Sequence, residues 1–199
     1  MTMLTLFHKP KTRSNSIMWL LEELGVPYET KEVTIRSMDG SGAIDPANPH
    51  PHGKVPALEH DGNRVFETGA IALYLTDLFP EKKLGPVPGE ALRGEYLSWL
   101  FYRSGVLEPA LMMRRLGVKH MQGAMGWAEA SEVETVLNET LALRPYILGD
   151  SFSAADIVTG GGIVYLLRFK MLAETPVLTE YAQRLTSRPA FIKVMGDHT

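Results

Sequence analysis

The chain has 199 residues, 45% of them apolar and 22% charged, which fits one mid-sized or two small globular domains with a buried core. Its 20 Lys and Arg against 23 Asp and Glu leave a net charge of -3, so no general attraction to nucleic acid or anionic membrane is expected. Because cysteine is absent, disulfide frameworks, thiolate metal sites and mechanisms in which the protein supplies the sulfur are excluded.

The apolar runs of the chain are short. The longest, over residues 70–75 and 163–167, fall far below the ~20 residues that span a bilayer. The N-terminus also lacks a secretory layout, since residues 1–7 are too few for an apolar signal core and basic residues follow them instead of preceding them. We therefore expect a cytoplasmic protein that does not bind membranes.

The first elements predicted along the chain form a β-α-β unit. Residues 3–7 alternate as a short buried strand and end at a turn. A helix over 16–24 follows, closed by Gly25 and Pro27, and residues 28–35 read as a second strand parallel to the first. The apolar face of this helix has residues at i, i+3, i+4 and i+7, which are Ile17, Leu20, Leu21 and Leu24.

The rest of the first eighty residues predicts a functional loop, a hairpin and a helix. Residues 37–52 have loop composition, and loops of this length inside a domain are usually functional. Short apolar segments over 55–59 and 64–67 flank an Asp-Gly pair, which is a strong hairpin signal. Thr68 then opens a helix that ends before Pro80.

A Pro/Gly-rich run over 80–89 separates this part from a helical one. We predict an α/β domain over 1–80, a linker over 81–89 and an all-helical domain over 90–199. Ser153 and Asp156 resemble a helix capping box, and the three glycines at 160–162 indicate close helix packing rather than nucleotide binding. Helices are predicted over 90–116, 126–143, 154–172, 177–186 and 189–195.

Three places in the first domain carry residues suited to ligand binding. Pro56 stands directly before a strand, where a cis peptide can leave the N–H and C=O of Val55 unpaired and available to an extended peptide. Glu67 and Thr68 stand at a strand-to-helix junction, where a hydroxyl and free N–H groups favour a carboxylate. Residues 12–16 open the first helix, whose dipole and hydroxyls favour an anion.

Together these segments resemble the cytosolic glutathione transferase superfamily. The resemblance covers essentially the whole chain and implies a thioredoxin-like α/β N-terminal domain followed by an all-α C-terminal domain. It also implies a detoxification enzyme of the bacterial, hydroxyl-type kind, without a catalytic cysteine. In chain order it rests on FHKPKTRSNSIMWLLEELGVPYE, GKVPAL, FETGAIALYL, the proline-rich linker and SFSAADI.

The resemblance implies that glutathione binds the first domain as a co-substrate, with no metal or other cofactor. The backbone before the cis proline would pair with the cysteinyl part. The acid and hydroxyl at the second helix would hold the γ-glutamyl amine and carboxylate, and a basic residue before the proline would hold the glycyl carboxylate. These residues are, in the same order, Val55 and Pro56, Glu67 and Thr68, and Lys54 or His52.

Because glutathione supplies the sulfur, the site has to stabilise a thiolate. An ordinary thiol has a pKa near 8.5, and each unit of lowering requires about 1.4 kcal/mol of preferential thiolate stabilisation. One charge-assisted hydrogen bond and a helix dipole are large enough for this. The family's activating residue falls at or beside Thr12, where many relatives have Ser, Tyr or Cys, and Ser14 is the nearest alternative hydroxyl. A purely structural role as helix caps stays open for both.

The loop before the cis proline departs from the family pattern. Its sequence NPHPHGKVP is two residues longer than the common NPxGKVP form, which we expect to reshape the glycyl end of the site. His50 and His52 invite a metal interpretation, but no cysteine or nearby acidic residue in the sequence supports it.

The resemblance also implies an electrophile pocket bordered by the first long helix of the second domain. Core packing is the default role for large apolar residues there, yet one or two of them are expected to line the pocket. The candidates are Trp99, Tyr102, Met112 and Met113.

The resemblance therefore implies a glutathione transferase that joins glutathione to a small apolar electrophile, and it also implies a homodimer. Two alternatives stay open. One is glutathione-dependent isomerisation or peroxide reduction, and the other is a non-catalytic, transferase-like binding or interaction module.

Overall fold

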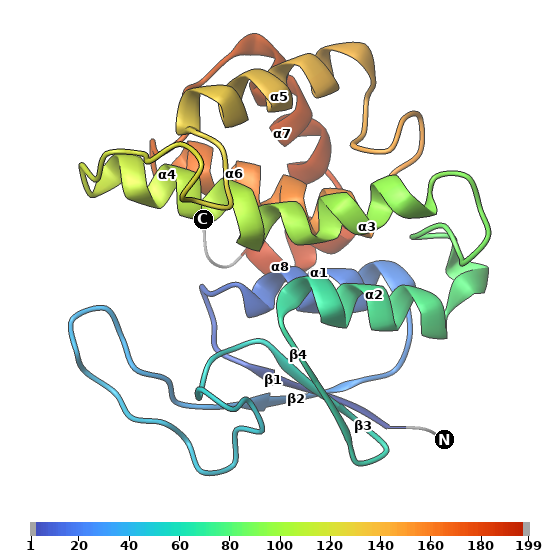
Figure 1. The fold of residues 1–199 in the computed structure, drawn as a ribbon. Coiled ribbons are helices and arrows are strands. Elements are labelled where there is room, and N and C mark those ends of the chain that lie inside the picture. The colour runs from blue at the N-terminus through green and yellow to red at the C-terminus, as the bar shows by residue number, and fades with distance from the viewer. Residues whose placement is uncertain (1–2, 197–199) are drawn as a thin grey trace. The chain divides into compact units, whose positions relative to one another are not determined.

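A computed structural model describes residues 3–196 of the chain, which form two compact units. The first unit extends to Lys82 and also takes in the chain from Pro189 onward. The second unit is Lys83–Arg188. The α-helices and strands of both units are drawn in Figure 1.

A four-stranded mixed sheet with the order β2-β1-β3-β4 forms the base of the first unit. β1 is parallel to β2 and antiparallel to β3, and β3 is antiparallel to β4. This is the predicted thioredoxin-like arrangement, with a β-α-β unit joined to a β-hairpin. The strands are β1 (Leu4–His8), β2 (Glu29–Glu32), β3 (Ala57–His60) and β4 (Asn63–Phe66).

Burial along the strands follows their places in the sheet. Leu4 and Leu6 of the central strand β1 are buried, whereas every residue of the edge strand β2 is exposed and its sequence, ETKE, is charged. The hairpin turns at Asp61 and Gly62, whose φ values of 49° and 80° are both positive. A two-residue turn of that kind matches the twist of the strands, which explains the Asp-Gly signal.

Helices α1 (Ser14–Leu24) and α2 (Thr68–Leu78) cover the sheet of the first unit (Figure 1). A short 3-10 turn, Pro80–Lys82, follows α2. The helix α1 starts two residues earlier than predicted, so Ser16 lies inside the helix and does not cap it. Gly25 ends α1 in the left-handed conformation, with φ at 62°, as the sequence predicted.

The last helix, α8 (Pro189–Met195), packs against α1 within the first unit. The Phe191 ring meets the buried Trp19 ring edge-on at 5.0 Å between centroids, and Lys193 donates to Glu22 at 2.6 Å. From the sequence, this segment was assigned to the helical domain over 90–199. Its apolar periodicity predicts a helix but does not indicate which element the helix packs against. Its contacts join it to the α/β unit instead.

The second unit is built from helices that are more interrupted than predicted. The segment predicted as one helix over 90–116 is divided by a π-helical turn, Arg103–Leu107, and the segment at 154–172 starts with another, Asp156–Gly160. The helix predicted from residue 126 begins at Ala130. The α-helices are α3 (Arg93–Tyr102), α4 (Glu108–Arg115), α5 (Ala130–Leu143), α6 (Gly161–Arg168) and α7 (Pro176–Thr186).

Asp156 organises the core of the second unit. Its carboxylate accepts hydrogen bonds from Ser153 N–H at 2.9 Å, Ile147 N–H at 2.8 Å and the Tyr181 hydroxyl at 2.8 Å. The same Tyr181 hydroxyl occupies the space that a Cβ on Gly160 would need. These contacts confirm the predicted capping pair and the predicted close packing at the glycines.

Replacing Phe191 by Ala tests whether α8 stabilises the first unit. The substitution removes the edge-on contact with Trp19 and should lower the free energy of unfolding by about 2 kcal/mol, since the ring is half-buried. Chemical denaturation measures this. Ile192→Ala on the same helix is the control, because Ile192 is 54% exposed and should cost little. Equal losses in the two variants would contradict the assignment of α8 to this unit.

Candidate functional site

The pairing register brings the three predicted ligand-binding places to one end of the sheet. Phe7 of β1 is the partner of Ala57 of β3, and Ala57 is in turn the partner of Phe66 of β4. The turn after β1, the loop before β3 and the junction after β4 therefore leave the sheet side by side. Segments from residues 9–14, 55–56 and 67–68 meet there although they are far apart in the sequence.

The backbone of Val55 is available for pairing at this end. The Val55–Pro56 peptide is cis, as predicted. Within the described range 3–196, neither the N–H nor the C=O of Val55 has a hydrogen-bond partner, and its side chain is half-buried. The neighbouring basic residues Lys54 and His52 are both exposed. An extended peptide could add its own backbone to this edge.

Ser14, the first residue of α1, is fully buried and has several hydrogen-bond partners. Its Oγ lies 2.8 Å from His8 Nδ1 and 2.7 Å from Thr12 Oγ1. It also accepts from the Lys9 N–H at 3.2 Å and can donate to the Lys9 carbonyl oxygen at 3.1 Å. With an exposed fraction of 0%, Ser14 cannot itself contact a ligand in this conformation.

Thr12 is the more accessible of the two predicted hydroxyls. It is half-buried, and its hydroxyl donates to the Lys9 carbonyl oxygen at 2.6 Å. It also accepts from the backbone N–H of Ser14, two residues on, at 3.3 Å. Thr12 thus stands at the N-terminus of α1 with one face toward the turn and one face toward solvent.

Glu67 and Thr68 mark the start of α2. Glu67 has φ at 70° and ψ at 128°, a conformation that L-residues rarely adopt, and its side chain is 64% exposed. Among the described residues, no side chain hydrogen-bonds to the first N–H groups of α2, so these stay available to an anion. Backbone strain of this kind is common where a side chain has to be held for a ligand.

His50 connects the long loop to Glu67. It is 7% exposed, its Nδ1 accepts from the His52 N–H at 3.1 Å, and its Nε2 lies 3.7 Å from Glu67 Oε1. The accepted bond at Nδ1 assigns the ring hydrogen to Nε2, which faces the carboxylate. Burial lowers the pKa of His50, although the charge of Glu67 acts in the opposite direction. The sequence alone showed no acidic residue near His50, but the fold supplies one.

Asn48 ties the same loop to the residue that precedes Val55. Its side-chain N–H donates to the Lys54 carbonyl oxygen at 2.9 Å, and its Oδ1 accepts from the His50 N–H at 3.0 Å. His8, Asn48 and His50 were not predicted from the sequence to belong to this site. The one available signal was their position, since His8 ends a buried strand and the other two lie in the long loop.

The candidate electrophile residues lie on two helices of the second unit. Trp99 is 8% exposed and its Nε1 donates to Glu95 at 3.3 Å, so it belongs mainly to the core. Tyr102 is half-buried at the end of α3, and burial raises the pKa of its hydroxyl. Met112 is 44% exposed on α4, while Met113 lines a pocket.

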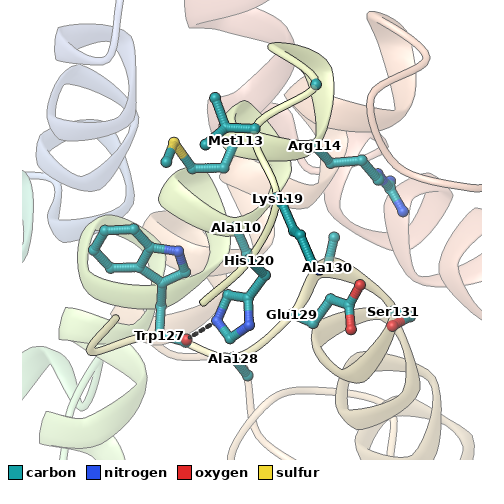
Figure 2. Close-up of a pocket in the computed structure, with 12 residues that line it drawn as sticks. Ala110, Met113, Arg114, Lys119, His120, Trp127, Ala128, Glu129, Ala130 and Ser131 are labelled. Carbon is teal, nitrogen blue, oxygen red and sulfur yellow. Dashed lines mark hydrogen bonds between the residues drawn. The ribbon is translucent and has the colours of Figure 1, made fainter. Parts of the chain in front are cut away.

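That pocket of about 290 Å³ lies within the second unit, between the end of α4 and the start of α5. Figure 2 shows the indole of Trp127 and the ring of His120 beside it, with His120 Nε2 donating to the Trp127 carbonyl oxygen at 2.8 Å. The Trp127 Nε1 is buried without a hydrogen-bond partner among the described residues. None of the predicted glutathione-binding residues lines this pocket.

Two features are absent from the described residues, 3–196. No group of three or more His, Asp or Glu side chains is arranged to hold a metal ion. No helix in that range is both long enough and apolar enough to cross a membrane.

Comparisons with known proteins agree with this architecture. The family described as "Glutathione S-transferase, N-terminal domain" matches residues 2–77. The chain is 30% identical over 205 residues to the disulfide-bond oxidoreductase YfcG of Escherichia coli, covering 94% of this chain and 92% of that protein.

Two solved structures are similar over nearly the full length. A glutathione transferase from Methylococcus capsulatus has a TM-score of 0.77 and 27% identity, covering 98% of both chains. A sphingomonad glutathione S-transferase complexed with glutathione has a TM-score of 0.72 and 28% identity, covering 97% of this chain and 98% of that one.

The fold is that of a thioredoxin-like sheet unit combined with a helical unit, with the unpaired backbone of Val55 beside a hydroxyl-rich helix start. On this architecture and these similarities, the chain belongs to the cytosolic glutathione S-transferase superfamily.

The burial of His50 predicts a specific dependence of stability on pH. His50 has a lowered pKa in the folded protein, so the unfolded chain takes up a proton near the ordinary pKa of about 6.5 while the folded protein does not. Stability should therefore fall as the pH drops below about 6.5. Thermal unfolding between about pH 7 and pH 5 should show a smaller loss in His50→Gln than in the parent. His52→Gln, at an exposed neighbour, is the control, and an unchanged pH dependence in His50→Gln would contradict the role of burial.

Proposed function

We propose that the protein is a glutathione transferase that joins the thiolate of glutathione to a small apolar electrophile. One observation carries this proposal. The unpaired backbone of Val55, the hydroxyl of Thr12 at the start of α1, and the pair formed by Glu67 and Thr68 at the start of α2 share one end of the sheet. Membership of the superfamily supports the same assignment.

Each part of glutathione has a suitable group at this end of the sheet. The cysteinyl backbone would pair with Val55, whose N–H and C=O have no partner among the described residues. The γ-glutamyl carboxylate would accept from the Thr68 hydroxyl and the first N–H groups of α2, and its ammonium would face Glu67. The exposed side chains of Lys54 or His52 would bind the glycyl carboxylate.

Thr12 is the proposed thiolate-stabilising residue. Its hydroxyl is half-buried at the positive end of the α1 dipole, whereas Ser14 is fully buried. Moving the thiol pKa from about 8.5 to near neutrality takes about 2 kcal/mol, the size of one charge-assisted hydrogen bond plus a helix dipole. Rate enhancement then comes from the available thiolate and from holding it next to the electrophile.

The electrophile is proposed to be apolar, with one or two of Trp99, Tyr102, Met112 and Met113 in contact with it. Thiolate attack on carbon either displaces a leaving group or adds to an activated double bond. A homodimer and a cytoplasmic location are part of the same proposal, carried by the family resemblance.

A second candidate function is glutathione-dependent disulfide reduction. The 30% identical E. coli relative is named a disulfide-bond oxidoreductase, and both reactions begin from a glutathione thiolate. Since this chain has no cysteine, the glutathione thiolate would itself attack the substrate disulfide, forming a mixed disulfide and releasing one substrate thiol. A second glutathione would then attack the mixed disulfide, which releases the other substrate thiol and forms glutathione disulfide. Parallel assays with an aryl halide and with a small organic disulfide would distinguish the two reactions.

Replacing Thr12 by Val should raise the thiol pKa of bound glutathione by roughly one to two units, because a hydrogen bond to the charged thiolate is lost. Ultraviolet absorbance of the thiolate, followed against pH, measures the shift. Thr12→Ser retains a hydroxyl and should stay close to the parent. An unchanged pKa in Thr12→Val would leave the backbone N–H groups of α1 as the stabilising groups. Retention of glutathione without any thiolate in the parent would favour the non-catalytic module.

Replacing Glu67 by Gln should weaken glutathione binding about tenfold, since the amide cannot pair with the γ-glutamyl ammonium. Calorimetric titration gives the dissociation constants. The matched ligand control is a glutathione analogue without the α-amine, for which the parent and Glu67→Gln should differ little. Glu29→Gln on the exposed strand β2 is the protein control. An equal effect on both ligands would contradict the assigned pairing.

A further inference from the structure

We propose that His8 receives the proton of the glutathione thiol through a relay of two hydroxyls, Ser14 and Thr12. His8 is a positioning residue in this scheme, because it acts through the hydroxyls and does not touch the substrate. The inference deepens the proposed function and rests on it. It concerns the destination of the proton, which thiolate stabilisation alone does not determine.

The relay consists of three atoms in a continuous line of short contacts. His8 Nδ1 lies 2.8 Å from Ser14 Oγ, and Ser14 Oγ lies 2.7 Å from Thr12 Oγ1. His8 and Ser14 are both buried, at 8% and 0% exposed, whereas Thr12 is half-buried. Of these three residues, Thr12 is the one whose hydroxyl can contact a ligand. His8 is the one that binds an additional proton near neutral pH.

The proton transfer balances without another reactant. The thiol S–H gives its proton to Thr12 Oγ1, the Thr12 hydroxyl proton passes to Ser14 Oγ, and the Ser14 hydroxyl proton passes to His8 Nδ1. The sulfur keeps the electron pair of the broken S–H bond. The products are a thiolate, two intact hydroxyls and a His8 imidazolium, so the net charge of the complex does not change.

The Lys9 carbonyl oxygen permits the necessary rearrangement of hydroxyl protons. Thr12 donates to it at 2.6 Å, and Ser14 Oγ is also within donating distance of it at 3.1 Å. After the transfer, when Thr12 donates to the thiolate and the His8 Nδ1–H donates to Ser14 Oγ, the Ser14 hydroxyl can donate to the Lys9 carbonyl oxygen in place of Thr12. The carbonyl therefore has a donor before the transfer and again after it, which limits the cost of leaving this acceptor unpaired.

The neighbours of His8 in the sheet include one carboxylate. Its register partner on β2 is Glu32, whose carboxylate also accepts from Lys9 at 2.9 Å. The hydrogen bond from Lys9 is the main cause of the lowered pKa of Glu32, and His8 contributes to the lowering as well. Two positive charges are also near in the chain, since Lys9 follows His8 and Arg13 directly precedes Ser14, the first residue of α1. On the β3 side the pairing ends at Phe7 and the apolar Ala57, one residue before His8.

A proton count on ligand binding tests the relay in the parent protein. Glutathione and S-methylglutathione, which has no thiol, are titrated by calorimetry near neutral pH in buffers of different ionisation enthalpy. Thiolate absorbance is recorded in parallel. The relay predicts that the two ligands release the same number of protons to the buffer although glutathione forms a thiolate, because the protein retains the thiol proton.

His8→Asn is the matched variant, because the Asn Oδ1 can occupy the place of His8 Nδ1 and accept from Ser14 but cannot hold a proton near neutral pH. In this variant each thiolate formed should release one additional proton to the buffer. A structural role for His8 would not change that count.

The outcomes separate the relay from the proposed function. If the parent forms the thiolate and releases one proton to the buffer for each thiolate formed, the relay is overturned and the transferase proposal stays intact. Absence of proton release in His8→Asn would also overturn it, since the proton would then reside elsewhere. Glutathione binding without a thiolate, or no binding, would overturn both proposals. If His8→Asn does not fold, the parent measurement is decisive by itself.

Discussion

The antiparallel pairing of β1 with β3, and of β3 with β4, is the constraint on which the candidate site depends. The aligned partners Phe7, Ala57 and Phe66 determine that three connecting segments leave the sheet at the same end. A shift of one residue in this register would turn buried side chains toward the opposite face, so burial of the core enforces the register. The hydrophobic core thereby positions polar groups that contribute nothing to it.

The polar groups at this end have buried neighbours. Ser14 hydrogen-bonds to His8 and Thr12 on one side, and the buried His50 of the long loop lies 3.7 Å from the Glu67 carboxylate on the other. Because buried donors and acceptors are costly to leave unpaired, the Ser14 hydrogen bonds limit how far Thr12 can move. The groups proposed to contact glutathione are thus accessible, while the groups that orient them are buried.

Much of the fold could be predicted from local sequence signals. The Asp61-Gly62 turn, the left-handed Gly25, the capping pair of Ser153 and Asp156 and the start of α2 at Thr68 all follow from short motifs with a direct stereochemical cause. The π-helical turns in the second unit could not be predicted, because apolar periodicity is nearly the same on either side of them. The partner of α8 was misassigned because its sequence specifies an apolar face but not its neighbour.

By itself, the sequence determined the element types, the absence of a protein thiol and the residues Thr12, Val55, Pro56, Glu67 and Thr68 as candidates for one site. These are local properties, set by backbone stereochemistry and by the chemistry of single side chains. Only the tertiary structure decided that Ser14 is inaccessible, that His8 stands behind it and that His50 faces Glu67. Such relations depend on distances between segments far apart in the chain, and those distances exist only after the sheet has paired.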